Sequence, residues 1–363
     1  NDRVVGYFDD HTDNYTQLNN QLVVSHIFND KWKINATAHY TFGSGYYLNY
    51  KNDQKLAKYG FEPIEVDGEM VARTNLLRKK SMRNDFGGVV TSATYTADKV
   101  SVIFGGAASL YDGVHFGEIS DLFFAPDFAA AEYYRNYTSK WDASCYAKVD
   151  WRVARGLNLY ADLQYRIVDY KAWGVNDNYD WNTMQMQPIN VDKQYHFLNP
   201  HIGLSYEFDN RNSIFISAAI AQKEPTRSDF TDRYMFADDD TQPSPEMLID
   251  YEAGYNYSSK RFSLGLNLYY MQYKDQLIPT GMVNDSSDAL NVNVPDSYRY
   301  GVEVSAAWEI TKWLTAGGNA TWSRNRIRNY VDLLADSPTY GENLGTMTIA
   351  YSPDVVASAY LDL

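Results

Sequence analysis

The chain has 363 residues, a formal net charge of −14 and 15% aromatic side chains, 32 of them tyrosines. The acidic balance argues against a nucleic-acid partner, and the single Cys145 excludes an internal disulfide framework. No stretch approaches the roughly 18 apolar residues that a helical membrane span needs, so a helical membrane protein is excluded as well.

Segments in which apolar and polar residues alternate recur along the whole chain. This period of two predicts β-strands, because successive side chains of a strand point to opposite faces. In 157–166, Leu159 and Leu163 share one face, whereas Asp162 and Arg166 share the other. The predicted strands span 14–27, 31–42, 85–97, 100–111, 138–153, 157–170, 197–208, 212–223, 247–258, 261–277, 297–310, 313–327, 343–352 and 355–363.

The connections between these strands alternate in length. Turn-forming residues join the strands in pairs at 29–30, 98–99, 155–156, 209–211, 259–260 and 311–312. Long segments separate the pairs at 43–84, 112–137, 171–196, 224–246, 278–296 and 328–342. Outer-membrane barrels have short periplasmic turns and long extracellular loops, whereas a soluble β-sandwich would not sort its connections by length. The pattern therefore predicts an all-β fold, an antiparallel transmembrane β-barrel of about 14 strands.

Charged residues such as Lys148, Asp162 and Glu303 fall on the polar faces of the predicted strands. A Lys or Arg on the lipid face near the midplane would cost about 2–4 kcal/mol. We therefore expect these charges to face the barrel lumen.

The strand directions predict where the two ends of the chain lie. Segment 14–27 runs toward a short turn and so descends from the extracellular side, while 355–363 follows a turn at 352–354 and is expected to ascend. Both ends would then be extracellular, which predicts a fragment of a larger barrel of about 22 strands. We expect a single barrel domain over 1–363, without the terminal strands.

Several motifs resemble the barrel of TonB-dependent outer-membrane receptors. The resemblance is most specific over 223–304, where KEPTRSDF at 223–230 is followed by DYEAGY at 250–255 and by the segments 267–278 and 293–304. The earlier segments 39–47 and 111–118 are similar to the Bacteroidota branch of that family.

The resemblance implies a 22-stranded barrel in the outer membrane of a Gram-negative bacterium, closed by a plug domain that is absent from this chain. Such receptors bind a scarce ligand, such as a ferric siderophore, haem, cobalamin or a glycan. They import it when the TonB complex pulls on a segment before the plug. The implied partners are a small-molecule or glycan ligand, outer-membrane lipid and, through the absent plug, the TonB complex.

The sequence contains no recognisable catalytic or metal constellation. The six histidines form no i, i+4 pair and no Cys/His cluster, and no Gly-x-Ser-x-Gly elbow is present. We therefore expect no enzyme activity, no metal and no cofactor.

Binding residues concentrate on loops held by a rigid scaffold, so we place the expected ligand site on the long loops. Aromatic side chains there could stack on a sugar, a catecholate or a macrocycle. An aromatic girdle or packing between loops is the competing interpretation of each residue. The expected binding residues are His115, Phe116, Glu118, Tyr133, Tyr134, Trp173, Tyr179, Trp181 and Arg227.

Three functions are open on the sequence alone, and one of them, an adhesin or assembly protein, is disfavoured because the sequence shows no dedicated loop domain. The favoured one is active transport by a TonB-dependent receptor, for which this chain supplies the loops and the lumen wall. The alternative is a passive 14-stranded porin or channel, which the strand number permits and the extracellular ends disfavour.

Overall fold

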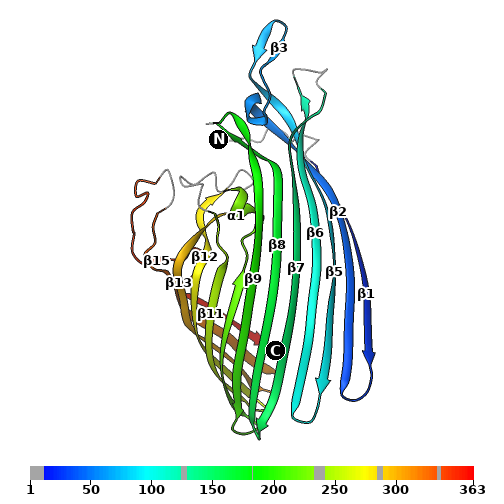
Figure 1. Ribbon diagram of the computed structural model, residues 1–363. Coiled ribbons are helices and arrows are strands. Elements are labelled where there is room, and N and C mark those ends of the chain that lie inside the picture. Colours follow the sequence, from blue (N-terminus) through cyan, green and yellow to red (C-terminus); the bar gives the residue numbers. More distant parts are fainter. Residues whose placement is uncertain (1–11, 124–128, 182, 233–241, 284–288, 333–336) are drawn as a thin grey trace.

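A computed structural model describes residues 12–123, 129–181, 183–232, 242–283, 289–332 and 337–363 (Figure 1). Its main feature is an antiparallel sheet of 14 strands, which confirms the predicted all-β class. No helix in the described ranges is long and apolar enough to cross a membrane.

From β1 to β14 the strands of the large sheet follow one another in an up-and-down order, with the β3–β4 hairpin inserted between β2 and β5. They are β1 (Asp13–Ile27), β2 (Trp32–Lys55), η1 (Leu56–Tyr59), β3 (Ile64–Val66), β4 (Glu69–Val71), β5 (Arg73–Thr96), β6 (Val100–Leu122), β7 (Ala131–Ala154), β8 (Leu157–Asp180), β9 (Gln185–Glu207), β10 (Asn212–Lys223), α1 (Arg227–Thr231), β11 (Glu246–Ser258), β12 (Phe262–Val283), β13 (Ala289–Thr311), β14 (Leu314–Ile327), β15 (Met347–Thr348) and β16 (Val355–Asp362).

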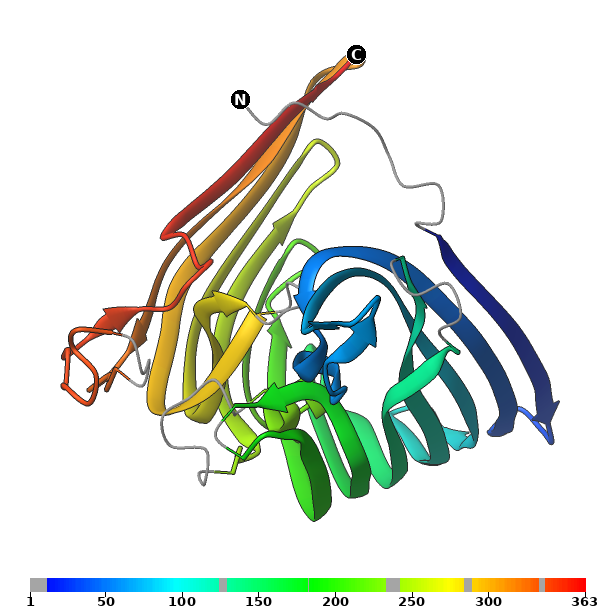
Figure 2. The same cartoon turned by 90° about the horizontal axis from the view of Figure 1, so that it is seen from above.

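The sheet curves into an open wall with β1 at one edge and β14 to β16 at the other (Figure 2). The small β3–β4 hairpin stands outside this sheet, and it projects beyond the ends of the strands (Figure 1). Short turns close the opposite end, as the connection lengths predict. Among the described residues, no ladder joins β1 to β16.

The two faces of the wall differ as the alternation predicts. Trp151, Leu163 and Trp308 lie on the outward face and are 45%, 49% and 53% exposed. An outward face rich in exposed apolar side chains, opposite an inward face that carries the charges, is typical of a barrel surrounded by lipid. The cross-strand register fixes this separation, because a slip of one residue would move every side chain to the other face.

The strands are much longer than the alternation predicts. The predicted loops 43–84, 112–137 and 171–196 are largely strand, since β5 begins at Arg73, β6 continues to Leu122 and β8 continues to Asp180. Only about 9–11 residues of a strand cross the membrane. Above that height neither face needs to be apolar, so the pairing continues while the sequence signal fades.

The prediction for the C-terminal hairpin is wrong. Segment 343–352 contains only the short β15, and β15 and β16 both pair antiparallel with β14. Because Val355 lies opposite Trp322 and Asp362 opposite Thr315, β16 runs toward the short turn before Leu314. The last strand therefore descends, and Leu363 does not end on the extracellular side. The direction count that placed both ends outside fails at this strand.

The outward face gives a direct test of the membrane assignment. Leu163 is the seventh residue of β8, and its neighbour Gln164 points to the lumen. We expect Leu163→Arg to lower the free energy of unfolding by about 2–4 kcal/mol, because the guanidinium would enter lipid. Urea unfolding of the full-length protein in lipid vesicles measures this. The matched variant Gln164→Arg should cost much less, and equal costs would contradict the assigned facing.

Candidate functional site

Four charged side chains form a network on the inward face of β7 and β8. Lys140 Nζ donates to Glu224 Oε1 at 2.6 Å, and the two terminal nitrogens of Arg166 donate to the two Glu224 oxygens at 2.8 Å. Arg166 also donates to Asp142 Oδ2 at 2.5 Å. Two cations and two anions therefore neutralise one another at one height of the wall.

Glu224 reaches this network because β10 ends at Lys223 and the chain then turns inward. The following α1 has a capping box. The side chain of Thr226 accepts a hydrogen bond from the backbone N–H of Asp229, and the side chain of Asp229 accepts one from the backbone N–H of Thr226. Asp229 Oδ1 also accepts from Asn291 Nδ2 on β13 at 3.0 Å. On the other side Phe230 stacks on Tyr170 of β8, with ring centroids 5.8 Å apart. Segment 224–231 is thereby fixed to β8 and to β13, two strands that lie far apart in the sheet.

The network determines the charge of Glu224. Burial by itself would raise the pKa of this carboxyl, but hydrogen bonds from Arg166 and Lys140 outweigh it and lower the pKa to about 2. The side chain of Glu224 is only 10% exposed, so the ion pairs are screened weakly by solvent. Glu224 is therefore ionised throughout the physiological range.

Two cavities flank Arg227 at the base of α1. One, of about 250 Å³, is lined by residues that include His115, Tyr134 and Arg227. The other, of about 370 Å³, is lined by His115, Arg227 and the strand residues beneath α1. Three of the residues predicted from the sequence therefore meet around one lumenal space, although they lie on β6, β7 and α1.

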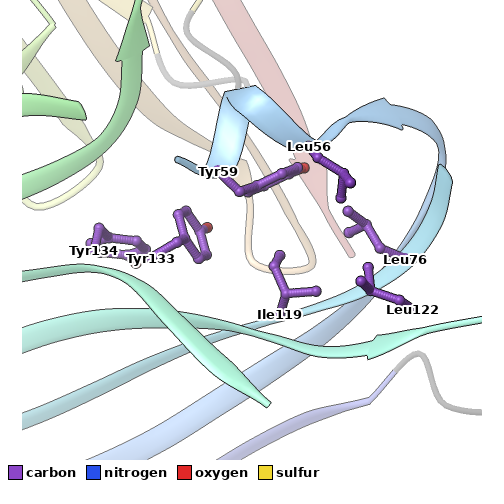
Figure 3. Close-up of a cluster of buried hydrophobic side chains, with 7 residues drawn as sticks. All are labelled: Leu56, Tyr59, Leu76, Ile119, Leu122, Tyr133 and Tyr134. Atoms are coloured by element: carbon purple, nitrogen blue, oxygen red, sulfur yellow. The ribbon is translucent and has the colours of Figure 1, made fainter. Parts of the chain in front are cut away.

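Tyr133 and Tyr134 also belong to a buried apolar cluster (Figure 3). Tyr133 meets the ring of Tyr59 edge to face at 5.0 Å and that of Tyr134 at 4.9 Å. Leu56 and Tyr59 of η1 pack against this cluster, which anchors the segment leading to the β3–β4 hairpin. Tyr133 is buried in this cluster and lines neither cavity, so packing is its observed role, whereas Tyr134 also lines the cavity of about 250 Å³.

Three other predicted residues point away from the lumen. Phe116 lies under the guanidinium of Arg135, with 4.3 Å between the guanidinium carbon and the ring centroid. Glu118 pairs with Lys79 at 3.2 Å, and Trp173 stacks on Tyr137 at 5.6 Å. The prediction that these residues lie on loops is wrong, because Phe116 and Glu118 belong to β6 and Trp173 to β8. The same prediction is wrong for His115, which belongs to β6, and for Tyr133 and Tyr134, which belong to β7.

The remaining predicted aromatic residues lie at the extracellular rim. Tyr179, at the end of β8, meets Trp181 edge to face at 4.8 Å. Lys55 Nζ lies 4.8 Å from the centroid of the Trp181 ring, which connects this pair to the end of β2. Tyr179 was also assigned to a loop and is instead in a strand.

Sequence reasoning did not identify Lys140, Asp142, Thr138 and Tyr170 as site residues. Each lies on the inward face of β7 or β8. Thr138, Lys140 and Tyr170 line the cavity beside segment 224–231, and Asp142 pairs with Arg166. Lys140 and Asp142 could have been identified by their charge on the polar face of a predicted strand, whereas Thr138 and Tyr170 gave no such signal. Within the described ranges, no group of three His, Cys, Asp or Glu side chains is placed to hold a metal.

An open antiparallel wall with an apolar outer face, a charged inner face and short turns at one end defines a large outer-membrane barrel protein. The chain belongs to the TonB-dependent receptor family, since the family model for the TonB dependent receptor-like β-barrel matches residues 1–363. The family consists of non-enzymatic outer-membrane transporters of Gram-negative bacteria, and this chain is accordingly an outer-membrane protein and not an enzyme.

Solved structures agree with this fold. The closed form of the ferric-catecholate import receptor Fiu from E. coli K12 has 15% identity and a TM-score of 0.61, with 97% of this chain and 52% of Fiu covered. The ferric yersiniabactin uptake receptor FyuA from Yersinia pestis has 13% identity and a TM-score of 0.64, covering 96% and 46%. The copper transporter OprC has 13% identity and a TM-score of 0.63, covering 86% and 46%. The chain thus spans about half the length of these receptors. No curated protein sequence matches it.

Glu224→Gln should destabilise the protein by about 1–3 kcal/mol, because Lys140 and Arg166 lose a charged hydrogen-bond acceptor. The folded-state pKa lies below the ordinary value, so this contribution is complete above about pH 4.5 and is lost as the pH falls toward 2. Urea unfolding of wild type and variant from pH 8 to pH 2 measures it. Glu132→Gln, which breaks an exposed pair with Arg135, is the control and should change stability by less than about 0.5 kcal/mol. A difference between wild type and Glu224→Gln that grows toward low pH would contradict the ion-pair assignment.

Gly117→Ala should loosen the cluster around Tyr134. A Cβ at Gly117 would lie 2.3 Å from Tyr134 Cε1 and 2.8 Å from Tyr133 Cε1, which both rings must move to accommodate. We expect faster tryptic cleavage at Lys55 or Lys58, measured on the folded protein. Gly87→Ala is the control, because its Cβ would meet other atoms only at 3.5 Å or more. Equal cleavage rates in both variants would show that the cluster does not hold η1.

Proposed function

We propose that the chain is the binding and gating wall of a TonB-dependent receptor that captures a scarce ligand at the cell surface and imports it. The ligand classes we propose are ferric siderophores, haem, cobalamin and glycans, with iron uptake as the leading case. The TonB complex would act through the plug domain of the receptor. Residues 1–363 would form one barrel domain of a longer protein.

The observation that carries this proposal is the lumenal space around Arg227. His115, Tyr134 and Arg227 come from three elements and meet on the inward face, above the part of the wall that crosses the membrane. Cavities of this kind, lined by aromatic, cationic and hydroxyl groups, suit a polar ligand with aromatic or anionic parts. A ligand entering past the rim pair Tyr179 and Trp181 would meet this space on its way into the lumen.

The passive porin receives less support. A 14-stranded porin would have to close β1 onto β16, yet β15 and β16 share one edge of β14. The ion pairs at Glu224 also fix segment 224–231 against the wall, where it occupies space that a passive channel would leave open. Both features favour a wall that works together with further chain.

The ligands named for Fiu, FyuA and OprC belong to those proteins. Among the residues predicted from the sequence, we propose His115, Tyr134 and Arg227 as ligand contacts in the lumen and Tyr179 and Trp181 as contacts at the rim. Phe116, Glu118 and Trp173 point to the outer surface, and Tyr133 is committed to the packing around η1.

Uptake in cells tests the proposal. A strain that lacks the full-length gene should fail to take up one labelled ligand from a panel of iron chelates, haem, cobalamin and glycans. The intact gene should restore uptake only when TonB is present. Uptake of small hydrophilic solutes that does not depend on TonB would instead establish the passive channel and overturn the proposal.

A further inference from the structure

A pocket of about 370 Å³ lies between the inward face of β6 to β8 and the start of α1. Its lining includes Tyr111 and His115 of β6, Thr138 of β7, Tyr170 of β8 and Arg227 of α1. The volume lies within the range of ligand pockets and greatly exceeds the roughly 30 Å³ that one water molecule occupies.

Three polar atoms of this lining are buried without a hydrogen-bond partner. They are Thr138 Oγ1, Tyr170 Oη and Arg227 Nε. Thr138 is 5% exposed and Tyr170 is 7% exposed. Leaving such groups unpaired is costly because they lose their hydrogen bonds to water, so native proteins normally supply a partner. Three orphaned groups around one cavity indicate a partner inside that cavity.

The three atoms are complementary to an acceptor. The Arg227 Nε–H can only donate, and the Thr138 and Tyr170 hydroxyls are both able to donate. The other contact of the guanidinium is with a neutral group, since its terminal nitrogen donates to Asn136 Oδ1 at 3.0 Å. No carboxylate forms an ion pair with Arg227 among the described residues, which leaves its charge available.

Among the described residues around the pocket, the charges that have no ionic partner are cationic. Lys140 is neutralised by Glu224, and Asp229 is occupied by Thr226 and Asn291. Lys223, which also lines the pocket, forms no ion pair within the described ranges and adds a second cation to Arg227. The pocket is thus locally cationic in a chain whose formal net charge is −14.

We propose that this pocket binds an oxyanion, a carboxylate or phosphate group, through Arg227, Thr138 and Tyr170. Arg227 supplies the charge and one donor, and the two hydroxyls direct further donors to the oxyanion oxygens. The pocket is small, so it holds an anionic end group of a larger ligand. The inference rests on the proposed function for the source of that group, which is the imported ligand.

Titration of the full-length receptor in detergent tests the pocket. The probes are inorganic phosphate and citrate, followed by the rise in melting temperature, because a ligand that binds only the folded state stabilises it in proportion to ln(1 + [L]/Kd). Sodium chloride at equal ionic strength is the reference. We expect a saturable rise with at least one probe, and an apparent Kd about tenfold or more weaker in both Arg227→Gln and the double variant Thr138→Val with Tyr170→Phe.

Lys171→Gln is the matched control. This substitution also removes one cation from β8, but Lys171 lies away from the pocket. Lys171 pairs with Asp192 at 3.3 Å, and the two side chains are 47% and 69% exposed. Its titration should equal that of the wild type. The double variant keeps the charge of Arg227, so it separates specific donors from general electrostatic attraction and guards against misfolding of the arginine variant.

The outcomes separate the two proposals. No saturable rise with either probe, or equal affinities in wild type and both pocket variants, would show a pocket filled by water alone and overturn the inference. TonB-dependent uptake with normal apparent affinity in Arg227→Gln would also overturn it and leave the proposed function intact. Saturable, Arg227-dependent binding in a protein without TonB-dependent uptake would keep the pocket and reject the transporter.

Discussion

The rest of this structure depends on backbone hydrogen bonding in an environment without water. Hydrocarbon offers no partner to an N–H or C=O group, so each strand that crosses the membrane must pair along its length with its neighbours. This requirement produces the continuous antiparallel ladders from β1 to β14 and fixes their registers. Because the ladders are continuous, side chains on neighbouring strands stand at defined heights. The inward charges then meet in pairs, whereas the outward side chains contact lipid.

The Glu224 network is a consequence of this fixed spacing. Lys140 and Arg166 project inward from adjacent strands, and both form ion pairs with the carboxylate of Glu224, which follows the end of β10. With Glu224 held, α1 takes its place on the wall and brings Arg227 toward His115 and Asn136. One carboxylate thus positions the short helix, and the helix positions the cation that faces the two cavities. Proteins commonly place binding residues in this way, on a connecting segment that a rigid sheet holds in position.

The sequence predicted the barrel class because half-buried strands carry a period of two that survives without knowledge of their partners. It also selected His115, Tyr134 and Arg227, which the fold brings to one space. It misplaced seven residues on loops, because the apolar stripe ends at the membrane boundary while the hydrogen-bonded strands continue above it. These residues are His115, Phe116, Glu118, Tyr133, Tyr134, Trp173 and Tyr179. It missed Thr138 and Tyr170 for a related reason. A threonine and a tyrosine on a strand are ordinary, and only their burial beside Arg227 without hydrogen-bond partners makes them notable.

The sequence by itself determined the all-β class, the order of strands, the short turns and the division into an apolar and a polar face. These properties are local, since they follow from alternation along one strand and from the composition of one turn. The tertiary structure alone decided the direction of β16, the height at which each charge stands and the meeting of β6, β7 and α1 around the pocket. Those properties depend on registers between segments far apart in the chain, and such registers are set by the sum of many cross-strand contacts and by no single residue.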